Sequence, residues 1–125
     1  LLQKPDASDR DEMAIQARAL ANLGPETILV KGGHLEGPDS PDVIWDEAGL
    51  HWFDGVRTDT KNTHGTGCTL SSTVAAQLAK GLRPRDAVAE AKHYVSGAIA
   101  AADQQTVGHG HGPVHHFYDF WKDKI

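Results

Sequence analysis

Residues 60–72 (TKNTHGTGCTLSS) hold the side chains of this protein that are best suited to chemistry. Gly65 and Gly67 flank Thr66, and Cys68, the one cysteine of the chain, follows at once. A helix is predicted from Cys68 onward, because apolar residues recur there every four positions: Leu70, Val74 and Leu78. A glycine-bearing turn ahead of a helix exposes unpaired N–H groups and the positive end of the helix dipole. The segment therefore predicts a site for an anion such as phosphate.

The glycine pattern leaves the ligand of this loop open. It is not a Walker A loop, because no Lys-Ser or Lys-Thr pair follows, and Leu70 stands where a dinucleotide fingerprint has its third glycine. Gly65 and Gly67 would let an anion reach the main-chain amides, and Thr66 and Thr69 would add hydroxyl donors. The alternative is an ordinary tight turn at the start of a helix.

Cys68 is expected in the first turn of that helix, where the helix dipole favours the thiolate form of a thiol. A thiolate at this place is able to act as a general base on a bound hydroxyl group. The competing interpretation is a small buried cysteine that serves as an apolar residue. A single cysteine makes no internal disulfide, which agrees with a reducing compartment.

Lys31 is the second candidate site residue. The run TILVK over residues 27–31 predicts a short buried strand, which Gly32 and Gly33 end. Ligands of α/β proteins collect beyond the carboxyl ends of strands, so a lysine there is well placed to meet phosphate oxygens as a point charge. The alternative is a lysine that extends from the strand end into water.

Histidines gather near the carboxyl end, in GHGHGPVHHF over residues 108–117. Their spacing has no cysteine or nearby acid of the kind that a zinc site uses, so we expect a loop that lines a site or the surface and no metal ligand. The four are His109, His111, His115 and His116. His34 and His64 adjoin the two candidate phosphate loops, where each is able to bind substrate or to cap a turn.

The first half of the chain is expected to hold one helix and short strands. Ser8 is the expected N-cap of the helix, answered by Asp11, and Gly24 with Pro25 ends it. An aromatic-rich hairpin is expected over residues 43–54, and residues 56–58 are a candidate for a further short strand.

The second half is expected to hold two helices. The first ends at Gly81, and the second begins at Pro84, a residue that favours the first helical position. A long apolar stripe follows, and an aromatic tail over residues 117–125 is expected to dock on the protein. One strand and several helices predict a layered α/β architecture whose sheet is incomplete.

Composition points to a soluble globular protein of one domain, or part of one. The formal net charge of -5 opposes a general nucleic-acid binder, which needs a basic face. No apolar run reaches the roughly 20 residues of a membrane span, and the first residues lack the apolar centre of a signal peptide. A cytoplasmic protein with no nucleic-acid or membrane partner is therefore expected.

Four segments in order resemble the hydroxymethylpyrimidine/phosphomethylpyrimidine kinases of thiamine biosynthesis, which belong to the ribokinase-like superfamily. They are TILVKGGH, TKNTHGTGCTLSSTVAAQLAKG, AVAEAKHYVSGAI and GHGHGPVHHF. The resemblance implies a ribokinase-like three-layer α/β/α fold, of which residues 1–125 would be the C-terminal half, with the N-terminal half absent. It implies ATP-dependent phosphorylation of 4-amino-5-hydroxymethyl-2-methylpyrimidine and its monophosphate, with Mg²⁺.

The same resemblance implies roles for individual residues. Gly65, Thr66 and Gly67 match the anion-hole motif of the superfamily, and Cys68 falls on the position of its catalytic base. Lys31 matches the lysine that these kinases direct at the transferring phosphate. The last helices and the C-terminal loop would border the base and ribose of ATP.

Alternatives to this function stay open. One is a pyridoxal kinase of the same superfamily. Another is a non-catalytic domain that binds an anion or a protein partner. A kinase fragment that is inactive without its N-terminal half is a further alternative. A homo-oligomer and a missing N-terminal half are both compatible with the sequence.

Overall fold

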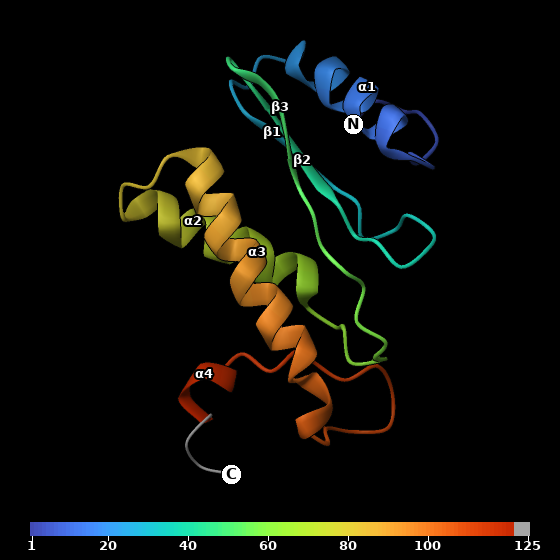
Figure 1. Cartoon of the computed structure of the whole chain (residues 1–125), viewed down its shortest axis with the longest axis vertical. Helices are drawn as coiled ribbons and strands as arrows, with labels where there is room; N and C mark the ends of the chain where they lie inside the picture. Colours follow the sequence, from blue (N-terminus) through green and yellow to red (C-terminus); the bar gives the residue numbers. More distant parts are fainter. Residues whose placement is uncertain (122–125) are drawn as a thin grey trace. The chain divides into compact units, whose positions relative to one another are not determined.

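The computed structural model describes residues 1–121 of the chain (Figure 1). The chain divides into two compact units, Leu1–Arg57 and Thr58–Ile125, which are described in turn. The aromatic tail predicted over residues 117–125 therefore lies partly outside the described residues. None of the helices described is long and apolar enough to cross a membrane.

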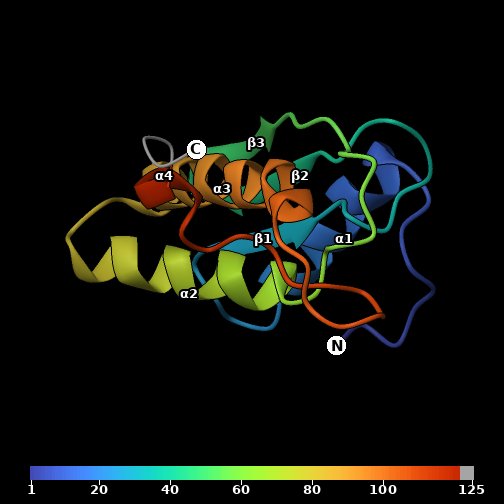
Figure 2. The same cartoon turned by 90° about the horizontal axis from the view of Figure 1, so that it is seen from below.

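The first unit packs one helix against a small sheet. Helix α1 (Arg10–Ala21) precedes strands β1 (Ile28–Lys31), β2 (Asp42–Asp46) and β3 (Gly49–Phe53). The sheet has three strands in the order β1-β2-β3, and both pairings are antiparallel. Helix α1 lies beside this sheet in both views (Figures 1 and 2). A cluster of buried apolar side chains holds the helix to the sheet: Met13, Ala17, Ile28 and Val43.

The N-cap of α1 is Asp9, so the prediction of Ser8 was wrong by one residue. The carboxylate of Asp9 accepts the amide of Glu12 at 2.8 Å. Ser8 instead donates its amide and its hydroxyl to the Glu12 carboxylate, at 2.7 and 2.8 Å. The capping sequence is therefore Asp-x-x-Glu, from Asp9 to Glu12. Glu12 is the third helical residue after Asp9, and its amide is the one that the Asp9 carboxylate accepts.

Strand β1 is less buried than predicted. Ile28 is buried, Leu29 and Val30 are half-buried, and Lys31 is exposed. The physical reason is that β1 is an edge strand, since it pairs with β2 alone among the described strands. The strand therefore lies where it was predicted, beginning one residue later at Ile28, but most of its residues are not fully buried.

The predicted hairpin is confirmed by β2 and β3, whose register pairs Trp45 with Leu50 and Val43 with Trp52. The further strand proposed over residues 56–58 was wrong, because Val56 forms only an isolated bridge to Asp39. The side chain of Arg57 fixes that region by donating to the main-chain oxygens of the loop over residues 33–39.

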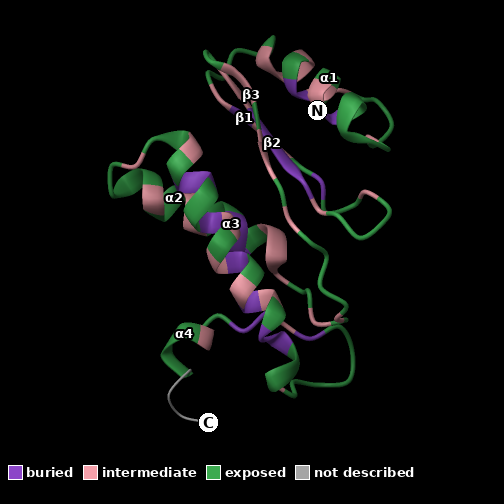
Figure 3. Cartoon of the chain, viewed as in Figure 1, coloured by how far each residue is buried: buried purple, intermediate pink, exposed green. Residues whose placement is uncertain are grey.

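The second unit is a helical hairpin with a C-terminal segment folded back on it. Helix α2 (Thr66–Ala79) packs against α3 (Pro84–Ala100), which η1 (Ala102–Gln104) and the short α4 (Tyr118–Trp121) follow. The buried residues of α3 form one stripe, visible in purple in Figure 3: Ala87, Val88, Ala91, Val95 and Ala98.

The ends of these helices agree with most of the sequence-based expectations. Pro84 is at the first helical position of α3, as predicted. Gly81 follows α2 with a φ of 93°, a left-handed value that favours glycine. Helix α2 begins two residues earlier than predicted, at Thr66, because Thr66 and Gly67 already have helical geometry.

Candidate functional site

The start of α2 presents main-chain donors, as the sequence predicts. Gly65 is the N-cap, with φ 83° and ψ 3°, and no side chain caps the helix. Thr66 turns back on the preceding loop: its amide and its hydroxyl both meet the main-chain oxygen of Thr63, at 3.2 and 2.6 Å. Within residues 1–121, the amides of Gly67 and Cys68 have no acceptor. Two neighbouring donors at the positive end of a helix therefore remain available to an anion.

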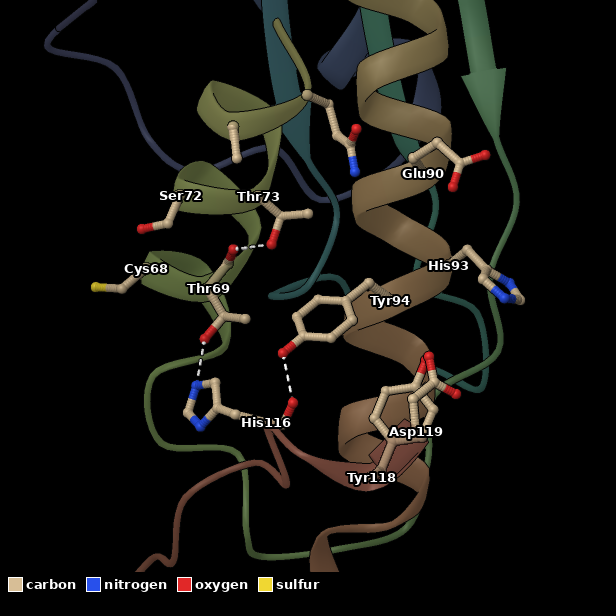
Figure 4. Close-up of a pocket in the computed structure, with 12 residues that line it drawn as sticks. Cys68, Thr69, Ser72, Thr73, Glu90, His93, Tyr94, His116, Tyr118 and Asp119 are labelled. Atoms are coloured by element: carbon tan, nitrogen blue, oxygen red, sulfur yellow. Dashed lines mark hydrogen bonds between the residues drawn. The ribbon is translucent and has the colours of Figure 1, made fainter. Parts of the chain in front are cut away.

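Cys68 is exposed, so its interpretation as a buried apolar residue was wrong. Its sulfur points away from the other labelled side chains of the site (Figure 4). The exposed thiol therefore belongs to the same residue as one of the two free amides.

An open pocket of about 740 Å³ extends along α2 and α3 from Cys68. Helix α2 supplies its hydroxyl-bearing wall, α3 supplies Glu90, His93 and Tyr94, and the C-terminal segment closes one end (Figure 4). The described lining residues are Cys68, Thr69, Ser72, Thr73, Ala76, Gln77, Glu90, His93, Tyr94, His116, Tyr118 and Asp119. Most of the lining residues have polar side chains, but the surface they expose to the pocket is largely apolar, and Cys68 is one of the residues at its edge.

The C-terminal segment is tied to both helices next to Cys68. Nε2 of His116 lies 3.0 Å from Oγ1 of Thr69, and the main-chain oxygen of His116 accepts the Tyr94 hydroxyl at 2.7 Å (Figure 4). Thr69 is buried although it is polar. Its partner on the ring of His116 accounts for that burial.

The histidine-rich segment is a loop that lines this unit, as predicted, and its residues have separate roles. His111 meets the main-chain oxygen of Lys61 at 3.1 Å through Nδ1, and the amide of His64 donates to Gly112. His115 is fully buried with its ring 4.6 Å from that of Trp121. Over the described residues, no three His, Cys, Asp or Glu side chains gather where a metal would bind.

Lys31 lies in the other unit, at the exposed end of β1. The next residue, Gly32, is buried and donates its amide to the Asp42 carboxylate at 3.0 Å. His34 is exposed in the same loop. Lys31 and the loop that ends at Cys68 belong to different units, so their meeting at one phosphate stays a prediction.

A family model described as phosphomethylpyrimidine kinase matches residues 1–115 of this chain. The chain belongs to the phosphomethylpyrimidine kinase family. It is 50% identical over 117 residues to a hydroxymethylpyrimidine/phosphomethylpyrimidine kinase of Rhizobium meliloti, covering 94% of this chain and 44% of that protein. It is 49% identical over 109 residues to a thiamine biosynthesis bifunctional protein of Geobacter sulfurreducens, covering 87% of this chain and 22% of that protein.

The fold of this phosphomethylpyrimidine kinase family member is similar to that of a solved kinase. A pyridoxal kinase of Bacillus subtilis, solved as an ADP complex, superposes with a TM-score of 0.84 at 29% identity, over 93% of this chain and 43% of that chain. The predicted class, the C-terminal portion of a ribokinase-like α/β protein, is confirmed. The chain spans less than half the length of either kinase that it matches.

Sequence reasoning missed several residues that hold the segments around the start of α2 in place. Tyr94 lies within the long apolar stripe that is predicted after Pro84, and the stripe does not indicate that its hydroxyl reaches His116. Asn62 and Asp103 were not singled out, although they bond to each other at 2.7 Å. The sequence alone does not indicate either bond, because Tyr94 and His116 are 22 residues apart and Asn62 and Asp103 are 41 residues apart.

Proposed function

We propose that this chain carries the phosphate-binding half of a kinase site of thiamine biosynthesis. ATP would be the phosphoryl donor, and 4-amino-5-hydroxymethyl-2-methylpyrimidine and its monophosphate the acceptors. The observation that carries the proposal is the pair of free amides at Gly67 and Cys68, with an exposed thiol beside them. Membership in the phosphomethylpyrimidine kinase family supplies the class of acceptor.

The amides of Gly67 and Cys68 would donate to the oxygens of the transferring phosphate. Phosphoryl transfer depends on positioning and on stabilising charge, and main-chain donors that are already in place supply both. Gly65 and Gly67 carry no side chain that would keep a phosphate away from these donors. Lys31 would add a positive charge to the same phosphate.

Cys68 would act as the general base in the first reaction. The acceptor oxygen forms a bond to the γ-phosphorus while the bond from that phosphorus to the β–γ bridging oxygen breaks, and ADP leaves. The hydroxyl proton passes to the thiolate of Cys68, which becomes a thiol. The product is the pyrimidine monophosphate, which is the acceptor of the second reaction.

Mg²⁺ is proposed to arrive with the nucleotide, because it neutralises the charge of the phosphates. The residues that the structure describes contain no cluster of three metal-ligating side chains. The described residues therefore do not form a protein cage for this ion.

A second candidate acceptor is pyridoxal, because the B. subtilis protein similar in structure to this chain is a pyridoxal kinase. The homologue at 50% identity carries the pyrimidine name, which favours the pyrimidine. A cytoplasmic location and a small-molecule acceptor belong to the proposal. So does the remainder of the site, which would come from a second copy of the chain or from the missing N-terminal half.

The test measures ADP release and product formation with Mg·ATP and each of three acceptors: the hydroxymethylpyrimidine, its monophosphate and pyridoxal. Turnover of both pyrimidines is the expected result. Turnover of pyridoxal alone would favour the second candidate. Calorimetric titration of the chain with Mg·ATP is the companion experiment, and no binding at millimolar nucleotide would favour a non-catalytic domain.

A further inference from the structure

The segment that leads into α2 is held by a hydrogen-bonded cluster that the proposed chemistry does not use. The Oδ1 atom of Asp103 accepts both the hydroxyl of Thr60 and Nδ2 of Asn62, at 2.5 and 2.7 Å. The hydroxyl of Thr60 also accepts the amide of Asn62, at 3.1 Å. These bonds fix the segment to the residue that lies in η1, directly after α3.

Asn62 also binds the histidine-rich loop on its other side. Its Oδ1 accepts the amide of Gly112 at 3.0 Å, across 50 residues of sequence. Two residues further on, the amide of His64 donates to the main-chain oxygen of Gly112 at 3.1 Å, and His64 forms a parallel bridge with Pro113. The side chain of Asn62 is therefore a joint between η1 and the loop.

The position requires a carboxamide. Nδ2 must donate to a carboxylate while Oδ1 accepts an N–H, and of the side chains of this size only asparagine does both. An aspartate there would keep the bond to Gly112 but would set a second negative charge against Asp103. Gly112 also leaves room for this side chain, since a Cβ atom at position 112 would collide with Oδ1 of Asn62 and push the carboxamide aside.

The joint lies close to the proposed phosphate donors. Four residues separate Asn62 from Gly67, and two of them are also held: His64 by Gly112, and Thr66 by Thr63. The direction of the amides of Gly67 and Cys68 depends on where this short segment is anchored. Hydrogen bonds to a charged group are stronger than those between neutral groups. The bond from Asn62 to the Asp103 carboxylate is therefore well suited to hold the segment in place.

We infer that Asn62 is a positioning residue for the phosphate loop, holding it to Asp103 and Gly112 so that the amides of Gly67 and Cys68 converge on the anion. The inference rests on the proposed function for the identity of that anion. The convergence of the amides is a property of the chain and is measured without any nucleotide.

The experiment compares Asn62→Asp with the exchange Asn62→Asp/Asp103→Asn. In the single variant two carboxylates face each other and the segment is released. In the exchange, the new carboxamide at position 103 donates to the new carboxylate, which still accepts the amide of Gly112. The matched control is Gln104→Glu, the same amide-to-acid change at an exposed neighbour whose side chain makes no hydrogen bond among the described residues.

The first measurement is the position of the Gly67 and Cys68 amide signals in nitrogen–proton NMR spectra of the ligand-free chain. Asn62→Asp should shift both signals, leave those of the buried residues Ala91 and Val95 in place, and weaken binding of Mg·ATP about tenfold. The exchange should restore the signals and the affinity, and Gln104→Glu should change neither.

Unchanged Gly67 and Cys68 signals in a folded Asn62→Asp variant would overturn the inference, as would an exchange that restores nothing. If Asn62→Asp does not fold, Thr60→Val is the milder substitution, because it removes only the hydroxyl that joins Asp103 and the amide of Asn62. This variant must then shift the amide signals of Gly67 and Cys68. A wild-type chain that binds no Mg·ATP would refute the proposed function alone, because the NMR comparison still decides the role of Asn62.

Discussion

Nε2 of His116 lies 3.0 Å from the hydroxyl oxygen of Thr69, a residue that is 47 positions earlier in the chain. Thr69 follows Cys68 in α2, and the main-chain oxygen of His116 is itself held by Tyr94 of α3. Three separate parts of the second unit therefore meet next to the thiol. The position of the first turn of α2 depends on this contact as well as on the helix itself.

Thr69→Val is expected to lower the free energy of unfolding by about 1 kcal/mol, because the isosteric change removes one hydrogen bond and leaves an exposed imidazole that water is able to satisfy. Urea unfolding followed by circular dichroism measures the loss. Thr73→Val is the matched control, since that hydroxyl only returns to the main-chain oxygen of Thr69 in its own helix, at 2.8 Å. An equal loss in both variants would show that the bond to His116 contributes nothing.

The neighbouring glycines after Lys31 should respond differently to alanine. A Cβ atom on Gly32 would collide with the main-chain oxygen of Pro41, whereas one on Gly33 would meet no atom within 4 Å. Gly32→Ala should therefore cost about 1–3 kcal/mol, since the obstacle is backbone, and Gly33→Ala should stay within about 0.5 kcal/mol. Unfolding followed by the fluorescence of Trp45 and Trp52 reports on this unit. Similar values for the two variants would contradict the close approach to Pro41.

The elements of the chain were largely predictable because they depend on local signals. The spacing of apolar residues predicts α2 and α3, Pro84 predicts the start of α3, and alternation around a turn predicts the β2–β3 hairpin. The errors have local causes too. Asp9 and Ser8 are both good caps, and only the position of Glu12 decides between them.

The candidate site was predictable only where one segment supplies it. Gly65 and Cys68 are neighbours in sequence, so their relation follows from a helix start. The bond between Thr69 and His116 joins residues far apart, and single residues of this kind have no local signature. The exposure of Cys68 was also beyond the sequence, because burial depends on which side of α2 meets α3.

Gly65→Ala tests the left-handed turn in front of α2. The φ of 83° at Gly65 is unfavourable for a residue with a Cβ atom, although no atom lies within 4 Å of that position. We expect a loss of about 1 kcal/mol from backbone strain and weaker binding of Mg·ATP. Gly65→Asn should lose less, because asparagine tolerates this conformation.

The control for this change is Gly110→Ala, which lies in the same unit, has open space around it and has no positive φ. Its free energy of unfolding should change by less than about 0.5 kcal/mol. Should Gly65→Asn prove as damaging as Gly65→Ala, the left-handed conformation would not be the cause.

Cys68→Ala separates the proposed base from the proposed phosphate site. In the first phosphorylation the acceptor is an alcohol that must lose a proton, so removal of the base should lower kcat by about 10²–10⁴-fold. In the second, the acceptor is a phosphate monoester whose oxygen is already anionic near neutral pH, and the loss should be much smaller. Binding of Mg·ATP should be retained, because the amide of residue 68 remains and the alanine methyl leaves it accessible.

Cys68→Ser distinguishes proton transfer from shape. A serine hydroxyl has the same geometry as the thiol, is slightly smaller and is a much weaker acid, so it should rescue the first reaction little if the thiolate removes the proton. Steady-state rates with each acceptor, measured for the wild type and both variants at the same nucleotide concentration, give the comparison. Equal losses in the two reactions would count against the base, and would instead indicate that Cys68 acts on a step that both reactions share.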